Sequence, residues 1–397
     1  MGGNFALRGY QAGPPTRRLQ ASLPPLRPPI LRCARLALLI AACLAAPAQA
    51  AAPAAPQILV SSRRVAMDAA PHARPASHQP PSSGQAAEPD SLEPAVVPPE
   101  ITCSCDRRTC SCGLREFWMV SSREAPVCRG LDRGVDRLSY WKCERGRWQR
   151  HTVDEFVAAM DPSLTTTFFV HGNTLDSEGA TEAGRVLYEH LGRGVPAFRL
   201  VLWSWPAERI RGKSVRANVT EKARSSESQG YYLAWLIDQI DPATPLSLTG
   251  HSFGARTVSA ALQGLASGRI ARHDLPERLY AGPRSIQAAL VAAPIDGDWL
   301  YPGKQHELAL SQVERMLITV NRRDLVLRTF TRLSGRRVEA VGTTGLVEKW
   351  RLGEQRSKVI EIDASPWLGC LHLWSRYAEN PQAAARLRPY FFNMPSP

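Results

Sequence analysis

Short apolar runs, separated by longer segments with helical periodicity, dominate the chain from about residue 103 onward. An apolar run of four to eight residues is typical of a strand that is buried on both faces, as in a parallel sheet. The expected strands are Phe117–Ser121, Leu138–Trp148, Thr166–Val170, Phe198–Trp203, Pro245–Thr249, Ile286–Ala292, Met316–Val320 and Lys358–Ile362. The first two are expected to pair as an antiparallel hairpin.

The segments between these runs carry apolar residues at the i, i+3, i+4, i+7 spacing of an amphipathic helix. The clearest cases are Leu233, Leu236, Ile237 and Ile240, followed by Val258, Ala261, Leu262 and Leu265. Strands that alternate with helices predict an α/β fold, a mostly parallel sheet of about eight strands with helices on both faces. We place its early strands in residues 101–150 and its core in residues 151–397.

The N-terminal 50 residues differ from this pattern. They contain six arginines and no Asp or Glu, an apolar run at Leu36–Ala46, and then small residues ending in Ala48-Gln49-Ala50. A basic region, a short apolar region and a small-residue site, in that order, predict a signal peptide and an exported chain, periplasmic or extracellular. The long basic region leaves two alternatives open, a start codon further downstream and an organellar transit peptide.

A lipid anchor is a second interpretation of the same segment. Ile40-Ala41-Ala42-Cys43 resembles the site at which bacterial lipoproteins are cleaved and lipidated on cysteine, so Cys43 is either a membrane anchor or an ordinary small residue. Residues 51–100 hold ten Pro and twelve Ala without an aromatic residue. Such a stretch buries too little apolar surface to offset its ordering entropy, which predicts a disordered linker.

Charge adds little to the functional picture. The chain has a net charge of +13, of which the six arginines of the leader supply six and residues 51–397 the remaining +7. No run of basic residues with interleaved aromatics argues for nucleic acid. The segment Ala207–Lys222 is rich in basic residues, Arg209, Arg211, Lys213 and Arg216. It is either a solvated loop or a cap that attracts an acidic substrate.

Six cysteines cluster ahead of the core: Cys103, Cys105, Cys110, Cys112, Cys128 and Cys143. In an exported chain an even cluster predicts disulfides, whose pairing the sequence does not choose. A zinc site is the alternative, because Cys103-Ser-Cys105 and Cys110-Ser-Cys112 offer four thiolates, although the spacing is not the usual C-x-x-C. Cys370 stands apart, and we expect it to be a buried small residue.

The sequence Gly250-His251-Ser252-Phe253-Gly254 joins an expected strand to an expected helix. In this context G-x-S-x-G predicts a nucleophile elbow, a sharp turn that exposes the serine hydroxyl above the sheet. Ser252 is therefore the candidate nucleophile. His251 is not expected to be its base, because a residue next to the nucleophile in a tight turn points away from it.

The acid and the base of such a site follow the serine in the order Asp, His, each after a later strand. Asp324, after Met316–Val320, fits the acid and would also serve as a helix N-cap; Asp298, after the preceding strand, is the fallback. His372, beyond the last strand, is the only histidine after His306 and is the candidate base. Its alternative role is a structural histidine.

An oxyanion hole needs two N–H donors that are fixed before the reaction. One is the N–H of the residue after the nucleophile, Phe253, and the other comes from an earlier loop. The run Phe168–Asn173 ends in His171-Gly172-Asn173, where the glycine allows close backbone approach. The Asn173 N–H is therefore the second candidate donor.

From Phe117 to the C-terminus the chain resembles the α/β-hydrolase superfamily, and within it an uncharacterised bacterial esterase/lipase-like family of unknown function. The motifs that carry the resemblance are Phe169-Val170-His171-Gly172-Asn173, Trp203-Ser204-Trp205-Pro206, Gly250-His251-Ser252-Phe253-Gly254 and Ala293-Pro294-Ile295-Asp296-Gly297-Asp298. The resemblance implies an α/β-hydrolase sheet order and the Ser252, Asp324, His372 triad, but no substrate. The cysteine-rich segment before Phe117 departs from the common fold.

These residues predict a serine hydrolase that cleaves a small-molecule ester through an acyl-enzyme. Such chemistry requires no cofactor and no metal, and no nucleic-acid partner is expected. Hydrolysis of an amide or a thioester remains open. A non-catalytic envelope or scaffold module that keeps the fold without the activity is the alternative from a different class.

Overall fold

The computed structural model describes residues 115–394, apart from residue 271, residues 277–283 and residues 335–337. The expected signal peptide, the linker, Cys43 and the four cysteines from Cys103 to Cys112 lie outside the described residues. In the part of the chain that is described, no helix is both long enough and apolar enough to cross a membrane.

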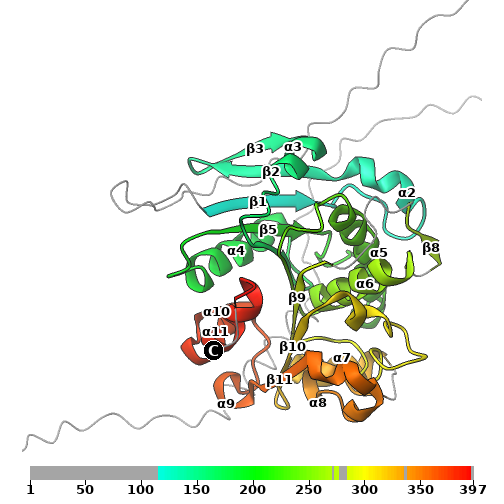
Figure 1. Cartoon of the computed structure of the whole chain (residues 1–397). Coiled ribbons are helices and arrows are strands. Elements are labelled where there is room, and N and C mark those ends of the chain that lie inside the picture. The colour runs from blue at the N-terminus through cyan, green and yellow to red at the C-terminus, as the bar shows by residue number, and fades with distance from the viewer. Residues whose placement is uncertain (1–114, 271, 277–283, 335–337, 395–397) are drawn as a thin grey trace, which may run out of the picture. The chain divides into compact units, whose positions relative to one another are not determined.

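A nine-stranded sheet organises the described residues (Figure 1). Its strands are β1 (Arg115–Ser121), β2 (Ser139–Glu144), β3 (Arg147–His151), β4 (Thr166–Val170), β5 (Phe198–Ser204), β6 (Leu246–His251), β9 (Ile286–Val291), β10 (Arg315–Val320) and β11 (Val359–Asp363). Their order across the sheet is β11-β10-β9-β6-β4-β5-β1-β2-β3. Every pair from β11 to β1 is parallel, and β1-β2 and β2-β3 are antiparallel. A separate two-stranded sheet pairs β7 (Arg269–Ile270) with β8 (His273–Asp274).

The expected α/β fold with a mostly parallel sheet and helices on both faces is thus confirmed, with one correction to the number of strands. The run Leu138–Trp148, expected as one strand, forms β2 and β3 with a two-residue turn between them. Both turn residues, Arg145 and Gly146, have positive φ, 51° and 81°. This backbone conformation matches the twist of the flanking strands and closes a tight hairpin.

Helices connect the strands. They are α2 (Leu131–Gly134), η2 (Val135–Arg137), α3 (Val153–Ala158), α4 (Ser177–Val186), η3 (Leu187–Leu191), α5 (Val215–Asp238), α6 (Phe253–Ser267), η4 (Ala309–Gln312), α7 (Leu325–Ser334), α8 (Val341–Thr344), η5 (Lys349–Lys358), α9 (Ser365–Leu368), α10 (Trp374–Glu379) and α11 (Pro381–Phe391). The two helices expected from their apolar spacing are α5 and α6. The basic segment expected as a loop or cap contains the first two turns of α5.

Helices cover both faces of the sheet, with α5 and α6 on one face and α4, α10 and α11 on the other (Figure 1). All five residues of β4, all seven of β5 and all six of β6 are buried, as strands between two helical layers must be. The two faces of the sheet therefore lie in two separate apolar cores.

The strand order changes direction between β4 and β6. After β4 the chain continues to β5 on one side of it, and then returns to β6 on the other side. The loops at the carboxyl ends of the strands diverge at such a switch point and leave a crevice between them, which is where open α/β sheets bind ligands. The turn after β6 and the loop after β4 are thus the expected position of a functional site.

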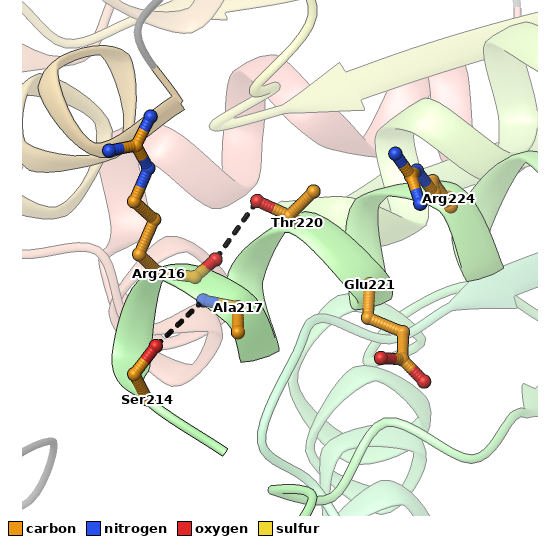
Figure 2. Close-up of a pocket in the computed structure, with 6 residues that line it drawn as sticks. All are labelled: Ser214, Arg216, Ala217, Thr220, Glu221 and Arg224. Carbon is orange, nitrogen blue, oxygen red and sulfur yellow. Dashed lines mark hydrogen bonds between the residues drawn. The ribbon is translucent and has the colours of Figure 1, made fainter.

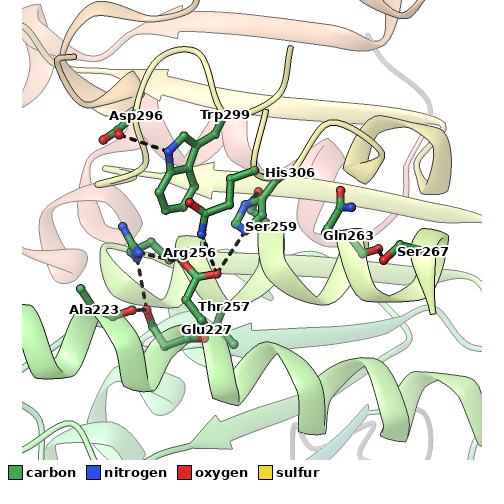
Figure 3. A network of polar contacts seen from close by, with 12 residues as sticks. Ala223, Glu227, Arg256, Thr257, Ser259, Gln263, Ser267, Asp296, Trp299 and His306 are labelled. Carbon is green, nitrogen blue, oxygen red and sulfur yellow. Dashed lines mark hydrogen bonds and ion pairs between the residues drawn. The ribbon is translucent and has the colours of Figure 1, made fainter. Parts of the chain in front are cut away.

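A buried polar network joins α5, α6 and the segment that follows β9 (Figure 3). The Glu227 carboxylate accepts hydrogen bonds from Arg256 Nη2 at 2.7 Å and Gln305 Nε2 at 3.2 Å, and lies 3.3 Å from His306 Nε2. The guanidinium of Arg256 stacks over the Trp299 ring, 4.5 Å from its centroid. The network therefore fixes α6, the helix that starts at the sheet's switch point, against its neighbours.

The charge state of Glu227 follows from these contacts. Burial raises the pKa of its carboxyl, but the charges of Arg256 and His306 and the hydrogen bonds with His306 and Gln305 outweigh burial and lower the pKa from its ordinary 4.5 to about 2. A folded-state pKa below the unfolded value means that the carboxylate stabilises the fold above about pH 4.5. This contribution is lost as the pH falls from 4.5 toward 2.

We predict that Glu227→Gln lowers the free energy of unfolding by roughly 3 kcal/mol at pH 7, because it removes the negative charge that faces the buried Arg256 guanidinium. Urea unfolding measures this change. The difference between parent and variant should shrink as the pH falls from 4.5 toward 2, because the carboxyl is protonated near pH 4.5 in the unfolded parent but only near pH 2 in the folded parent. The control is Glu182→Gln at an exposed position of α4, which is expected to change the free energy of unfolding by less than about 1 kcal/mol. Equal effects of the two substitutions would contradict a stabilising role for Glu227.

Candidate active site

The turn between β6 and α6 holds Ser252 in a strained conformation. Ser252 is the only residue between the two elements, and its φ of 54° and ψ of −124° lie outside the regions that non-glycine residues ordinarily adopt. A Cβ on Gly250 would collide with the backbone of Gly254, and a Cβ on Gly254 with the Val170 carbonyl. The two glycines of G-x-S-x-G are therefore required by the close approach of three backbone segments.

Three predicted side chains meet at this turn. Ser252 Oγ lies 2.9 Å from His372 Nε2, and His372 Nδ1 lies 2.7 Å from Asp324 Oδ2. A carboxylate only accepts hydrogen bonds, so Nδ1 carries the proton and donates it to Asp324. The Nε2 atom of the neutral ring is then the acceptor for the Ser252 hydroxyl. The three residues, far apart in the sequence, thus form one continuous hydrogen-bonded chain.

Asp324 makes contacts with its second oxygen as well. Its Oδ1 accepts the backbone N–H groups of Val326 and Leu327 at 2.9 and 3.0 Å and so caps the first turn of α7, while the residue is fully buried. Both roles weighed for Asp324 from the sequence are thus visible in its contacts. The fallback acid, Asp298, pairs instead with Lys304 at 2.7 Å.

The loop after β4 packs directly against the serine. A Cβ on Gly172 would lie 3.2 Å from Ser252 Cβ, so the backbone at this position is next to the nucleophile candidate. Asn173 follows in the same loop, and its buried Oδ1 has no hydrogen-bond partner in the described part of the chain. Phe253 is the first residue of α6, where an N–H group has no acceptor within the helix. Phe253 thus directly follows Ser252, and Asn173 directly follows the glycine that packs against it.

His171 holds this loop to the end of β5. Burial lowers the pKa of its imidazole to about 3, so the ring is neutral. Its Nδ1 donates to the Gly172 carbonyl at 2.8 Å, its Nε2 accepts the backbone N–H of Trp205, and the Trp205 indole N–H donates to the His171 carbonyl. The histidine of this motif is therefore a structural group.

His251 holds the other side of the site, a role that the sequence did not indicate. Its Nε2–H donates to the backbone carbonyl of His372 at 2.8 Å, and the centroids of the two imidazole rings are 5.1 Å apart. Burial lowers the pKa of His251 to about 3, and the charge of His372 acts in the same direction, so His251 remains a neutral donor. Asn321 Nδ2 donates to the Leu371 carbonyl at 3.3 Å. Two side chains thus fix the backbone that carries His372.

The structure corrects two expectations for cysteines. Cys370 is half-buried and disulfide-bonded, not a buried small residue. It lies two residues before His372. Cys128 was expected in a disulfide but is an exposed, free cysteine. Among the described residues, no group of three or more His, Cys, Asp or Glu side chains could hold a metal ion.

Comparisons with known proteins give remote likenesses only. No protein-family model matches the sequence, and no curated protein matches it. The resemblance to an uncharacterised esterase/lipase-like family therefore stays a prediction.

Several solved structures are similar in part. A bifunctional GH43-CE protein of Bacteroides eggerthii is 14% identical over 58% of this chain and 31% of its own, with a TM-score of 0.33. An acetyl xylan esterase is 13% identical over 57% of this chain and 95% of its own, with a TM-score of 0.30. An esterase of Pyrobaculum calidifontis is 12% identical over 64% of this chain and 79% of its own, with a TM-score of 0.28. These likenesses carry no argument about chemistry, which follows from the contacts among Ser252, His372 and Asp324.

We predict that Asp324→Asn lowers the turnover of a reactive ester by about 10⁴-fold, because an amide no longer fixes the His372 tautomer. The fold should persist, since Asn is an equally good N-cap for α7. Steady-state kinetics of Asp324→Asn and Asp298→Asn, measured with the same ester, test this prediction. The Asp298 variant should stay within a few-fold of the parent, since its carboxylate contacts Lys304 and not His372. A larger loss for Asp298→Asn would transfer the acid role to that residue.

We also predict that His251→Phe lowers kcat by about 10- to 100-fold with little change in KM, because the His372 backbone loses a fixing donor and the imidazole drifts from Ser252. The rate of fluorophosphonate labelling should fall in parallel, at an unchanged far-UV spectrum. His190→Phe, a histidine of η3 away from this loop, is the control. Unchanged kcat in the His251 variant would show that the hydrogen bond does not position the base.

Proposed function

We propose that the chain is a serine hydrolase that cleaves an ester of a small or medium acyl group through an acyl-enzyme. The observation that carries the proposal is the hydrogen-bonded chain from Ser252 Oγ through His372 to buried Asp324, built on a strained turn. Nucleophile, base and orienting acid within hydrogen-bonding distance are the signature of covalent acyl transfer.

In the first step Ser252 Oγ attacks the ester carbonyl while its proton passes to His372 Nε2. The negative charge that develops on the carbonyl oxygen is stabilised by the N–H groups of Phe253 and Asn173. His372 then gives its proton to the leaving alcohol as the bond between carbonyl carbon and alcohol oxygen breaks. Asp324 remains ionised and stabilises the imidazolium between the two transfers.

In the second step water replaces the alcohol. His372 takes a proton from the water as it attacks the acyl carbon, and returns it to Ser252 Oγ when the acid leaves. The free serine is regenerated. The same two steps would hydrolyse a thioester, or an amide, whose amine is a poorer leaving group than the alcohol of an ester.

We propose that the chain is exported, acts in the periplasm or outside the cell on a small-molecule ester, and either stays soluble or is anchored through Cys43. The disulfide at Cys370 supports an oxidising compartment, because disulfides persist there and are rare in the cytosol.

We predict that Ser252→Ala lowers hydrolysis of 4-nitrophenyl butyrate by about 10⁴-fold or more, since removal of a triad member leaves only binding and the oxyanion donors. Release of 4-nitrophenol measures the change. Ser259→Ala, a buried serine further along α6, is the control for folding. If the purified parent chain neither cleaves activated esters nor reacts with a fluorophosphonate, the chain is instead the non-catalytic module considered from the sequence.

A further inference from the structure

The helix α5 extends past the nucleophile candidate. It packs in parallel with α6: Thr257 Oγ1 donates to the Ser226 carbonyl at 3.0 Å, and Ala234 and Gly264 lie opposite each other further along. This pairing places Lys222 at the level of Ser252, where Lys222 donates to the carbonyl of Pro206 in the loop after β5. The seven residues before Lys222 therefore rise about 10 Å beyond that level.

A hollow of about 390 Å³ runs along this end of α5, lined by residues of the projecting part and by Arg224, two residues after Lys222. Arg216, Thr220 and Arg224, spaced four residues apart, share one side of the helix (Figure 2). Glu221 also lines the hollow, but its side chain points away from theirs (Figure 2). Both guanidinium groups are exposed. Neither pairs with an acidic side chain in the part of the chain that the structure describes.

The acidic residues nearby are already neutralised. Glu221 is paired with Lys213, and Glu208 with Arg123 at 2.8 Å. The neighbouring helix α7 adds Arg328 and Arg332, both exposed, and contains no acidic residue. The helices α5 and α7, which pack side by side, thus present positive charge beside the carboxyl edge of the sheet.

We propose that Arg216 and Arg224 bind an anionic group of the substrate, so that the natural substrate is an ester bearing a carboxylate or a phosphate remote from the cleaved bond. This inference rests on the proposed function. A guanidinium binds either anion through two parallel N–H donors. A cleft edge with unpaired positive charge also raises the local concentration of anionic ligands.

A pair of esters with the same acyl chain tests the charge preference. In 4-nitrophenyl hydrogen suberate a carboxylate ends the chain, and 4-nitrophenyl octanoate has a methyl group there. The parent enzyme should show a kcat/KM about three- to tenfold higher for the suberate, mainly through KM, and added salt should reduce the difference. A phosphate-terminated ester of the same length distinguishes the two anions, since the preferred group gives the higher kcat/KM.

The double variant R216Q/R224Q should lose this preference while its kcat/KM for octanoate stays within twofold of the parent. The control R147Q/R193Q removes two exposed arginines, one at the start of β3 and one before β5, both at the amino ends of the strands. It should keep the preference for the suberate ester. A parent enzyme that cleaves both esters equally, or a double variant that retains the preference, would overturn the inference and leave the proposed function standing.

A binding measurement separates the two claims if neither ester is cleaved. Calorimetric titration of Ser252→Ala with 4-nitrophenyl hydrogen suberate should show binding that R216Q/R224Q weakens about three- to tenfold. Such binding without cleavage by the parent would refute the proposed hydrolase and retain the anion site. Absence of binding, or equal binding by the double variant, would overturn the anion site.

Discussion

The site depends on one constraint, the sharp turn that carries Ser252 between β6 and α6. A serine at φ 54° is strained by about 1 to 3 kcal/mol, so this conformation persists only because its surroundings impose it. The Ser252 N–H donates to the Val291 carbonyl at the end of the neighbouring strand β9, and the two flanking glycines let β4 and α6 close in on the turn. Sheet, turn and helix therefore fix the serine oxygen before any substrate arrives.

The histidine reaches this turn on a loop that is held from several sides. The last strand of the sheet ends at Asp363, and the chain returns past α9 before it presents His372. His251 and Asn321 donate to successive carbonyls of that loop, and the disulfide at Cys370 adds a covalent tie. The backbone that carries His372 is thus held by polar contacts to residues next to Ser252 and Asp324.

Much of this arrangement could be predicted from the sequence because its signals are local. Strands buried on both faces appear as apolar runs, and the nucleophile turn appears as two glycines around a serine. The approach of Asp324 to His372 could be predicted only from the order of residues after successive strands. The contact of His251 with the His372 carbonyl joins residues 121 positions apart and leaves no local pattern. Glu227 and Arg256 likewise looked like ordinary charged helix residues, and their burial follows only from the packing of α5 on α6.

If the triad works as described, Ser252 is the residue that the folded chain activates as a nucleophile. Peptide mapping of the fluorophosphonate adduct of the intact chain tests it most directly. We expect one equivalent of adduct, located on Ser252 in the peptide that contains Gly250-His251-Ser252-Phe253-Gly254, and none after denaturation, since activation requires the folded contact with His372. An adduct on another serine or a tyrosine, or equal reaction of the denatured chain, would contradict it.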